Sequence, residues 1–156
     1  MTLAAPDLVS GPVVAPFLAA AGRVTAFATP GRRVLVVDDD PAILELVGIR
    51  LSLAGCAIAV ARNGIQALER LSAFRPEAMV LDVSMPALDG FGVLSHMREK
   101  GLSCPTLVLS AGRNADDVRR AIELGARDYL TKPFRDDQLL LRVARLLIRS
   151  RDALDR

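Results

Sequence analysis

A strict alternation of short apolar runs with helix-like segments is the feature that most constrains this fold. The runs are too short for core helices, and most of them are apolar at nearly every position, as in strands buried on both faces. They cover residues 34–37, 56–61, 78–81, 105–110 and 128–131. Between and after them, helical spacing or turn residues predict helices over 41–54, 64–74, 90–100, 116–124 and 136–149. Five such units predict an α/β fold, a three-layer, doubly wound parallel sheet with helices on both faces.

Composition narrows the class of protein further. The chain has 156 residues and a net charge of +2, and its basic residues form no single block, so we expect neither direct nucleic-acid binding nor membrane insertion. Cys56 and Cys104 have neither metal spacing nor a disulfide framework, which favours reduced thiols and a cytoplasmic location. His96 is the only histidine, so a histidine-based metal site is not supported.

The first residues differ from the rest of the chain. Residues 1–31 are rich in Ala and Val and interrupted by proline, and we interpret them as a flexible N-terminal extension. Ala26-Phe27-Ala28 has the form of a signal cleavage site, but no basic segment precedes it and Pro12 and Pro16 interrupt the apolar part. We expect one domain over 32–150 and a short tail over 151–156.

Polar residues stand where four of the predicted strands end. Ligands of open parallel sheets bind beyond the carboxyl ends of the strands. The residues found there are Asp38, Asp39 and Asp40 after the first strand, Asp82 after the third, Ser110 at the end of the fourth and Lys132 after the fifth. Asp40 precedes Pro41 and is expected only to cap a helix.

The converging carboxylates need a positive partner. Two carboxylates about 4 Å apart repel by about 4 kcal/mol at an effective dielectric near 20. A hard divalent cation such as Mg²⁺ would suit carboxylate oxygens. Lys132 is the second candidate, and it is one of only two lysines among the 20 basic residues of the chain.

Together these residues resemble the receiver domain of two-component response regulators, over Arg32 to about Arg149. The matching stretches are 36–41 (VVDDDP), 81–86 (LDVSMP), 89–90 (DG), 109–111 (LSA) and 128–134 (DYLTKPF). The resemblance implies the flavodoxin-like strand order 2-1-3-4-5.

The resemblance also implies roles for the residues at the strand ends. Asp82 would be the nucleophile that accepts a phosphoryl group. Asp39, Asp82 and the backbone carbonyl of Ser84 would bind Mg²⁺ (or Mn²⁺), with Asp38 acting through a water molecule. Lys132 would neutralise charge on the transferring group.

Two further residues would carry the switch. The Ser110 hydroxyl would bond a phosphoryl oxygen and draw the following loop inward, and Tyr129 would swing toward the vacated space. As an alternative, Tyr129 is a fixed core aromatic. The resemblance also predicts a cis bond between Lys132 and Pro133.

The resemblance extends to partners. It implies a sensor histidine kinase or a histidine phosphotransfer protein as donor, an unknown downstream protein, and no separate substrate of the kind an enzyme has. The receiver is most similar to those of the winged-helix transcription-factor class, which dimerise through the fourth helix, fifth strand and fifth helix with ion pairs between subunits. We expect phosphorylation to switch protein–protein contacts through this face. Asp128 and Arg142 match one such pair, so a homodimer on phosphorylation is possible, but Arg127 and Gln138 depart from two others. We expect a stand-alone receiver, with the start of a longer regulator as the alternative.

Three other readings stay open. A haloacid-dehalogenase-like phosphohydrolase also uses an aspartate nucleophile, but its second aspartate would stand at Ser84 and no cap-sized insert is present. A flavodoxin-like nucleotide binder would carry a glycine-rich loop where this chain has carboxylates. A pseudo-receiver would keep the fold and never take phosphate.

Overall fold

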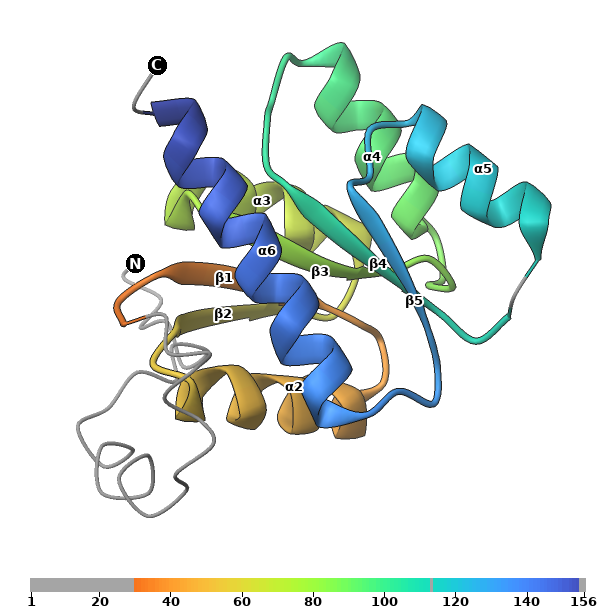
Figure 1. Ribbon diagram of the computed structural model, residues 1–156. Helices are drawn as coiled ribbons and strands as arrows, with labels where there is room; N and C mark the ends of the chain where they lie inside the picture. The colour runs from red at the N-terminus through yellow and green to blue at the C-terminus, as the bar shows by residue number, and fades with distance from the viewer. Residues whose placement is uncertain (1–29, 113, 155–156) are drawn as a thin grey trace, which may run out of the picture.

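The computed structural model describes residues 30–112 and 114–154 and contains one parallel sheet in the order β2-β1-β3-β4-β5 (Figure 1). This is the predicted order, and the predicted alternation is confirmed. The elements are β1 (Arg33–Val37), α2 (Pro41–Leu53), β2 (Ala57–Ala61), α3 (Gly64–Phe74), β3 (Ala78–Asp82), α4 (Gly90–Glu99), β4 (Thr106–Ser110), α5 (Ala115–Glu123), β5 (Asp128–Thr131) and α6 (Asp136–Leu154).

The helices cover the sheet in two layers, with α2 and α6 on one face and α3, α4 and α5 on the other (Figure 1). Alternate residues of β1 supply the two cores. Leu35 and Val37 pack into the core under α3, α4 and α5, whereas Val34 and Val36 pack into the core under α2 and α6. Because both sides of the strand are buried, it has no polar alternation, which explains why the sequence shows a continuous apolar run.

Capping side chains begin four of the five helices in the described part of the chain. Asp40 caps α2, and its side chain accepts a hydrogen bond from the Ala42 N–H at 2.9 Å, so its predicted role is confirmed. Asn63, Asp89 and Asn114 do the same for α3, α4 and α5. These caps satisfy N–H groups that have no partner inside the helix.

The end of the last helix differs from the prediction. We expected α6 to end near Arg149 and a tail to follow from residue 151, but the helix continues to Leu154. No glycine or proline occurs between Asp136 and Leu154, so nothing local stops the helix. Residues 151–154 are therefore helical.

Two further expectations concern the chain outside the sheet. The predicted flexible extension falls mostly on residues 1–29, which lie outside the described residues. Among the described residues, no helix combines the length and the apolar composition needed to cross a bilayer.

Cys56 and Cys104 form no disulfide, and burial raises the pKa of the Cys104 thiol to about 12, so this thiol stays protonated at neutral pH.

Candidate functional site

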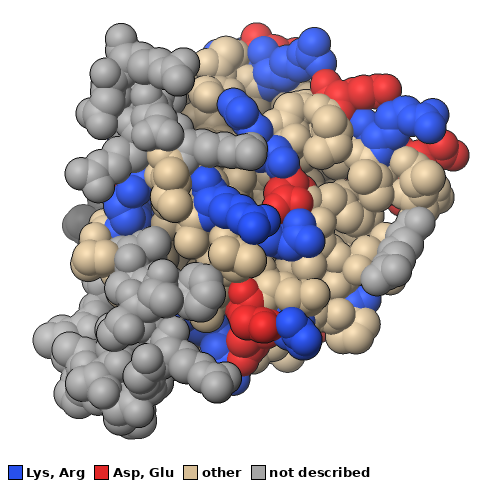
Figure 2. Space-filling model, viewed as in Figure 1, with Lys and Arg blue, Asp and Glu red and all other residues tan. Residues whose placement is uncertain are grey.

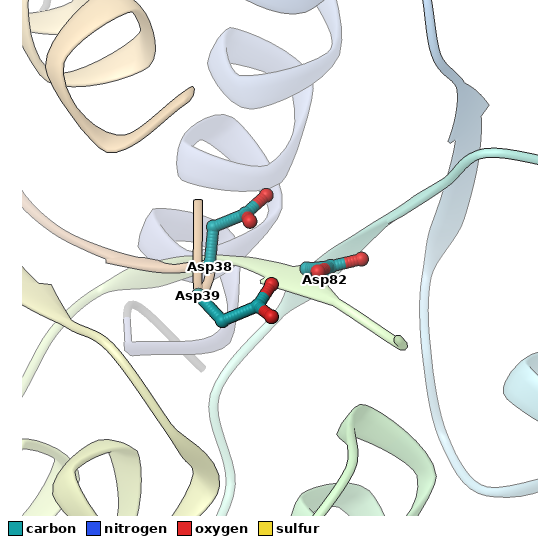
Figure 3. A group of neighbouring side chains, drawn as sticks. All are labelled: Asp38, Asp39 and Asp82. Atoms are coloured by element: carbon teal, nitrogen blue, oxygen red, sulfur yellow. The ribbon is translucent and has the colours of Figure 1, made fainter. Parts of the chain in front are cut away.

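The polar strand ends meet at one edge of the sheet. Val37 pairs with Leu81 in the register of β1 and β3, which places the following residues, Asp38 and Asp82, side by side. Figure 3 shows Asp38 and Asp39 extending from the loop after β1 to the same side of the sheet as Asp82. Carboxylate oxygens of the three residues lie within 4.8 Å of one another. The predicted acidic cluster therefore exists.

Lys132 reaches this cluster from the end of β5. Its Nζ donates to Asp38 Oδ2 at 2.8 Å and lies 3.6 Å from Asp82 Oδ1. Its backbone N–H donates to the Ser110 carbonyl at 2.7 Å, which ties it to the end of β4. The Lys132–Pro133 bond is cis, as predicted. One ammonium group thus lies beside two of the three carboxylates, Asp38 and Asp82.

Burial divides the three carboxylates. Asp82 is 3% exposed and Asp38 is 1% exposed, whereas Asp39 is exposed. The backbone N–H of Asp40 donates to Asp38 Oδ1 at 2.9 Å, so both oxygens of Asp38 already have donors. Asp82 has a single hydrogen bond among those described, from the Ser84 N–H at 3.2 Å. Asp82 is therefore the less fully paired of the two buried carboxylates.

The pKa of Asp82 reflects its burial and the charges around it. Its pKa is raised to about 6, chiefly by burial and also by the charges of Asp38 and Asp39, while the Ser84 hydrogen bond and Lys132 oppose the rise. Burial also lowers the pKa of the Lys132 ammonium, but its bond to Asp38 and the charge of Asp82 outweigh this, so the pKa lies above its ordinary value. Lys132 therefore stays protonated, but its single positive charge does not balance the three carboxylates of the cluster.

A divalent cation would supply that charge. Carboxylate oxygens are the ligands that Mg²⁺ prefers, and it commonly takes one or two of them together with water and phosphate oxygens. Asp39 and Asp82 are the two carboxylates of the cluster not bonded to Lys132 at hydrogen-bonding distance. The donor set therefore fits Mg²⁺.

The loop after β3 holds Asp82 through close backbone packing. A Cβ atom on Gly90, the first residue of α4, would lie 2.5 Å from the Asp82 carbonyl oxygen. The Gly90 N–H donates to the Val83 carbonyl at 3.2 Å. Only glycine allows α4 to begin this close to the strand end. The sequence shows Gly90 as part of a turn but gives no sign of this contact.

The predicted switch residues share one backbone partner. Ser110 Oγ accepts a hydrogen bond from the Gly112 N–H at 3.3 Å, and the Tyr129 hydroxyl donates to the Gly112 carbonyl at 3.1 Å. Tyr129 is half-buried and packs against the core under α3, α4 and α5. Gly112 therefore connects the two side chains, and no motif in the sequence indicated it.

The residues of the possible dimer face are paired within the chain. Arg142 Nη1 lies 2.6 Å from Asp128 Oδ1, and both side chains are about one-third exposed or less. On the face shown in Figure 2, basic side chains lie in separate groups, with acidic ones beside several of them. The Arg142–Asp128 pair is thus already satisfied in a single copy.

Comparison with known proteins points to one protein family. Residues 34–144 match the response regulator receiver domain family. The response regulator MprA of Mycobacterium ulcerans is 43% identical over 119 residues, which cover 76% of this chain and 51% of that protein. MprA of Mycobacterium avium is 42% identical over the same length. The chain therefore spans about half the length of the curated relatives it matches.

Solved structures resemble the fold closely. The receiver domain of the Francisella response regulator 1452 is 33% identical, with a TM-score of 0.73, and the match covers 77% of this chain and 99% of that one. The signal receiver domain from Bermanella marisrubri is 39% identical, with a TM-score of 0.70, and the match covers 75% and 98%.

Proposed function

The chain belongs to the response regulator receiver domain family, and from this premise we propose that Asp82 accepts a phosphoryl group from a phosphohistidine. The donor is a sensor histidine kinase or a histidine phosphotransfer protein. The observation that carries the proposal is a buried Asp82 carboxylate beside Asp38, Asp39 and Lys132, with its pKa raised to about 6. Paired and perturbed groups of this kind are typical of functional sites.

The reaction is a phosphoryl transfer with one bond made and one broken. A carboxylate oxygen of Asp82 attacks the phosphorus atom, the P–N bond to histidine breaks, and its electron pair stays on the imidazole nitrogen. The product is an acyl phosphate on Asp82. Attack by water on that phosphorus later returns the carboxylate and inorganic phosphate. Apart from this self-catalysed loss, the domain turns over no substrate.

The neighbours of Asp82 stabilise the transferring group by charge. Lys132 lies 3.6 Å from the Asp82 carboxylate, close enough to bond a phosphoryl oxygen attached there. Asp39, Asp82 and the backbone carbonyl of Ser84 would hold Mg²⁺ or Mn²⁺, with Asp38 acting through water. Mg²⁺ would supply positive charge against the phosphoryl oxygens. Asp38 already holds Lys132 at 2.8 Å and so orients it.

Phosphorylation is read out through Ser110 and Tyr129. The Ser110 hydroxyl donates a hydrogen bond to a phosphoryl oxygen, and by turning toward that oxygen it displaces the Oγ atom that now accepts the Gly112 N–H at 3.3 Å. Moving Gly112 removes the acceptor of the Tyr129 hydroxyl, so the ring can turn. This differential contact biases the domain between two states. A downstream protein reads the changed surface near β5, and a homodimer there requires Arg142 to exchange its own Asp128 for that of a second copy.

The test is phosphorylation by a small-molecule donor. The full chain is incubated with Mg²⁺ and acetyl phosphate, and its intact mass is measured. We expect the wild type to gain the mass of one phosphoryl group and Asp82→Asn to gain none. Asp40→Asn is the matched control, because it makes the same chemical change two residues from Asp38 at a side chain that only caps α2.

Three outcomes would contradict the proposal. Labelling of Asp82→Asn at the wild-type level would place the acceptor elsewhere. Absence of labelling in the wild type, with a folded domain and Mg²⁺ present, would instead make the chain a pseudo-receiver. Release of phosphate from a generic phosphomonoester at many turnovers per chain would favour the phosphohydrolase reading.

A further inference from the structure

Helix α2 carries a second apolar stripe that faces away from the protein. Its core side is formed by Leu44, Val47 and Leu51, all of which are buried. At about 100° per residue, positions 42, 46, 49 and 53 fall on the opposite side of the helix. These positions are all apolar: Ala42, Leu46, Ile49 and Leu53. Helices at a protein surface normally place polar residues there.

Within residues 30–112 and 114–154, the middle of this outer stripe is exposed, whereas Leu53 at its end is half-buried. Leu46 is 39% exposed and Ile49 is 46% exposed. Glu45 and Arg50 lie on either side of the stripe rather than within it, by the same helical geometry. Single exposed apolar residues are common and need no explanation, but a continuous stripe along three turns marks a contact surface.

The chain outside the described residues begins at one end of this stripe. The Gly31 N–H donates to the Gly55 carbonyl at 2.9 Å, and Gly55 is the second residue after Leu53, where α2 ends. Residues 1–29 are therefore attached to the domain beside the last residue of the stripe. A tether this short gives an attached segment a high effective concentration at the stripe, which a separate molecule lacks.

The composition of the attached segment suits an apolar surface. Residues 8–22 contain no charged side chain, since Asp7 and Arg23 are the nearest. Within them, residues 13–20 read VVAPFLAA. The nine residues 21–29 span up to about 30 Å when extended, and the 13 residues of α2 span about 20 Å. The segment can therefore reach every position of the stripe.

We propose that residues 13–20 dock in cis on the outer stripe of α2, against Leu46 and Ile49. Burying apolar side chains of both partners drives the contact. This revises the expectation of a wholly flexible extension.

The experiment measures amide hydrogen exchange and ¹⁵N relaxation in the full-length chain. We expect the amides of residues 13–20 to exchange about tenfold more slowly in the wild type than in Leu46→Glu/Ile49→Glu. This is the slowing expected if the segment is undocked, and open to exchange, about a tenth of the time. The matched control is Ile65→Glu/Ile122→Glu, which adds the same charge at two comparably exposed isoleucines on α3 and α5. The control should leave residues 13–20 protected.

Several outcomes overturn the proposal. If residues 13–20 of the wild type exchange and relax as fast as an unfolded chain, the segment does not dock on the stripe. Equal loss of protection in the two double variants would show that charge alone releases the segment. Protection that disappears on dilution, together with a mass twice that of one chain, would assign the contact to a second copy. In each variant, unchanged amide signals from β1 and β3 report that the domain is folded.

Discussion

Replacing Asp82 with asparagine should make the metal-free domain more stable at neutral pH. The carboxylate is 3% exposed and its pKa is raised from an ordinary value of 3.8 to about 6, chiefly by burial. Asparagine keeps an oxygen that can accept the Ser84 N–H but removes the buried charge. Lys132 retains its bond to Asp38 at 2.8 Å, so the substitution leaves no lone cation.

The magnitude follows from the pKa shift. Two pKa units correspond to about 3 kcal/mol at about 1.4 kcal/mol per unit. For an acid whose folded pKa lies above its unfolded pKa, the unfolded state releases its proton first, so stability falls as pH rises between about 4 and 6. Above pH 6 the whole penalty is present, and below pH 4 it is absent. We expect Asp82→Asn to gain about 1–3 kcal/mol at pH 7.5 and almost nothing near pH 4.

The assay is urea unfolding in EDTA at several pH values, with Asp40→Asn as the control at an exposed carboxylate that asparagine replaces equally well as a cap. Added Mg²⁺ should stabilise the wild type and not Asp82→Asn, which narrows the gap, because a ligand that binds only the folded state adds stability. A variant less stable than the wild type at pH 7.5 in EDTA, or a gain that does not shrink toward pH 4, would refute the electrostatic account of this site.

Two single substitutions next to the site and one double-mutant cycle at the Arg142–Asp128 pair test further features of the structure. Ala87 has a φ of 63°, a left-handed conformation that costs a non-glycine residue about 1–2 kcal/mol, so Ala87→Gly should raise the free energy of unfolding by about 0.5–1 kcal/mol after the greater chain entropy of glycine is subtracted; a lower urea midpoint would contradict this. Gly90→Ala places a Cβ 2.5 Å from the Asp82 carbonyl oxygen, so it should lower stability by about 2 kcal/mol or more and slow acetyl phosphate labelling, and wild-type behaviour in both assays would show that α4 need not begin so close. A double-mutant cycle of Arg142→Ala and Asp128→Ala should give a coupling of about 0.5–1 kcal/mol in a single copy, because the pair is about one-third exposed or less; a coupling that appears only in a phosphorylated dimer would place the bond between subunits.

The sequence alone determined the layout of the fold and the membership of the site. Short runs such as Val34–Val37 are strands because they are apolar on both sides, and the Asp40-Pro41 pair marks a helix start through local hydrogen bonding. Since parallel strands bring their carboxyl ends to one edge, Asp38, Asp82 and Lys132 had to approach one another. These conclusions depend only on neighbours along the chain and on a repeating pattern.

The tertiary structure decided what each of those residues experiences. Only packing shows that Asp38 and Asp82 are buried while Asp39 is exposed, and that Lys132 bonds Asp38 more closely than Asp82. The link through Gly112 and the outer stripe of α2 likewise depend on which surfaces meet. Burial, and the pKa shifts that follow from it, arise from segments far apart in the chain that exclude water together, and no local pattern records that exclusion.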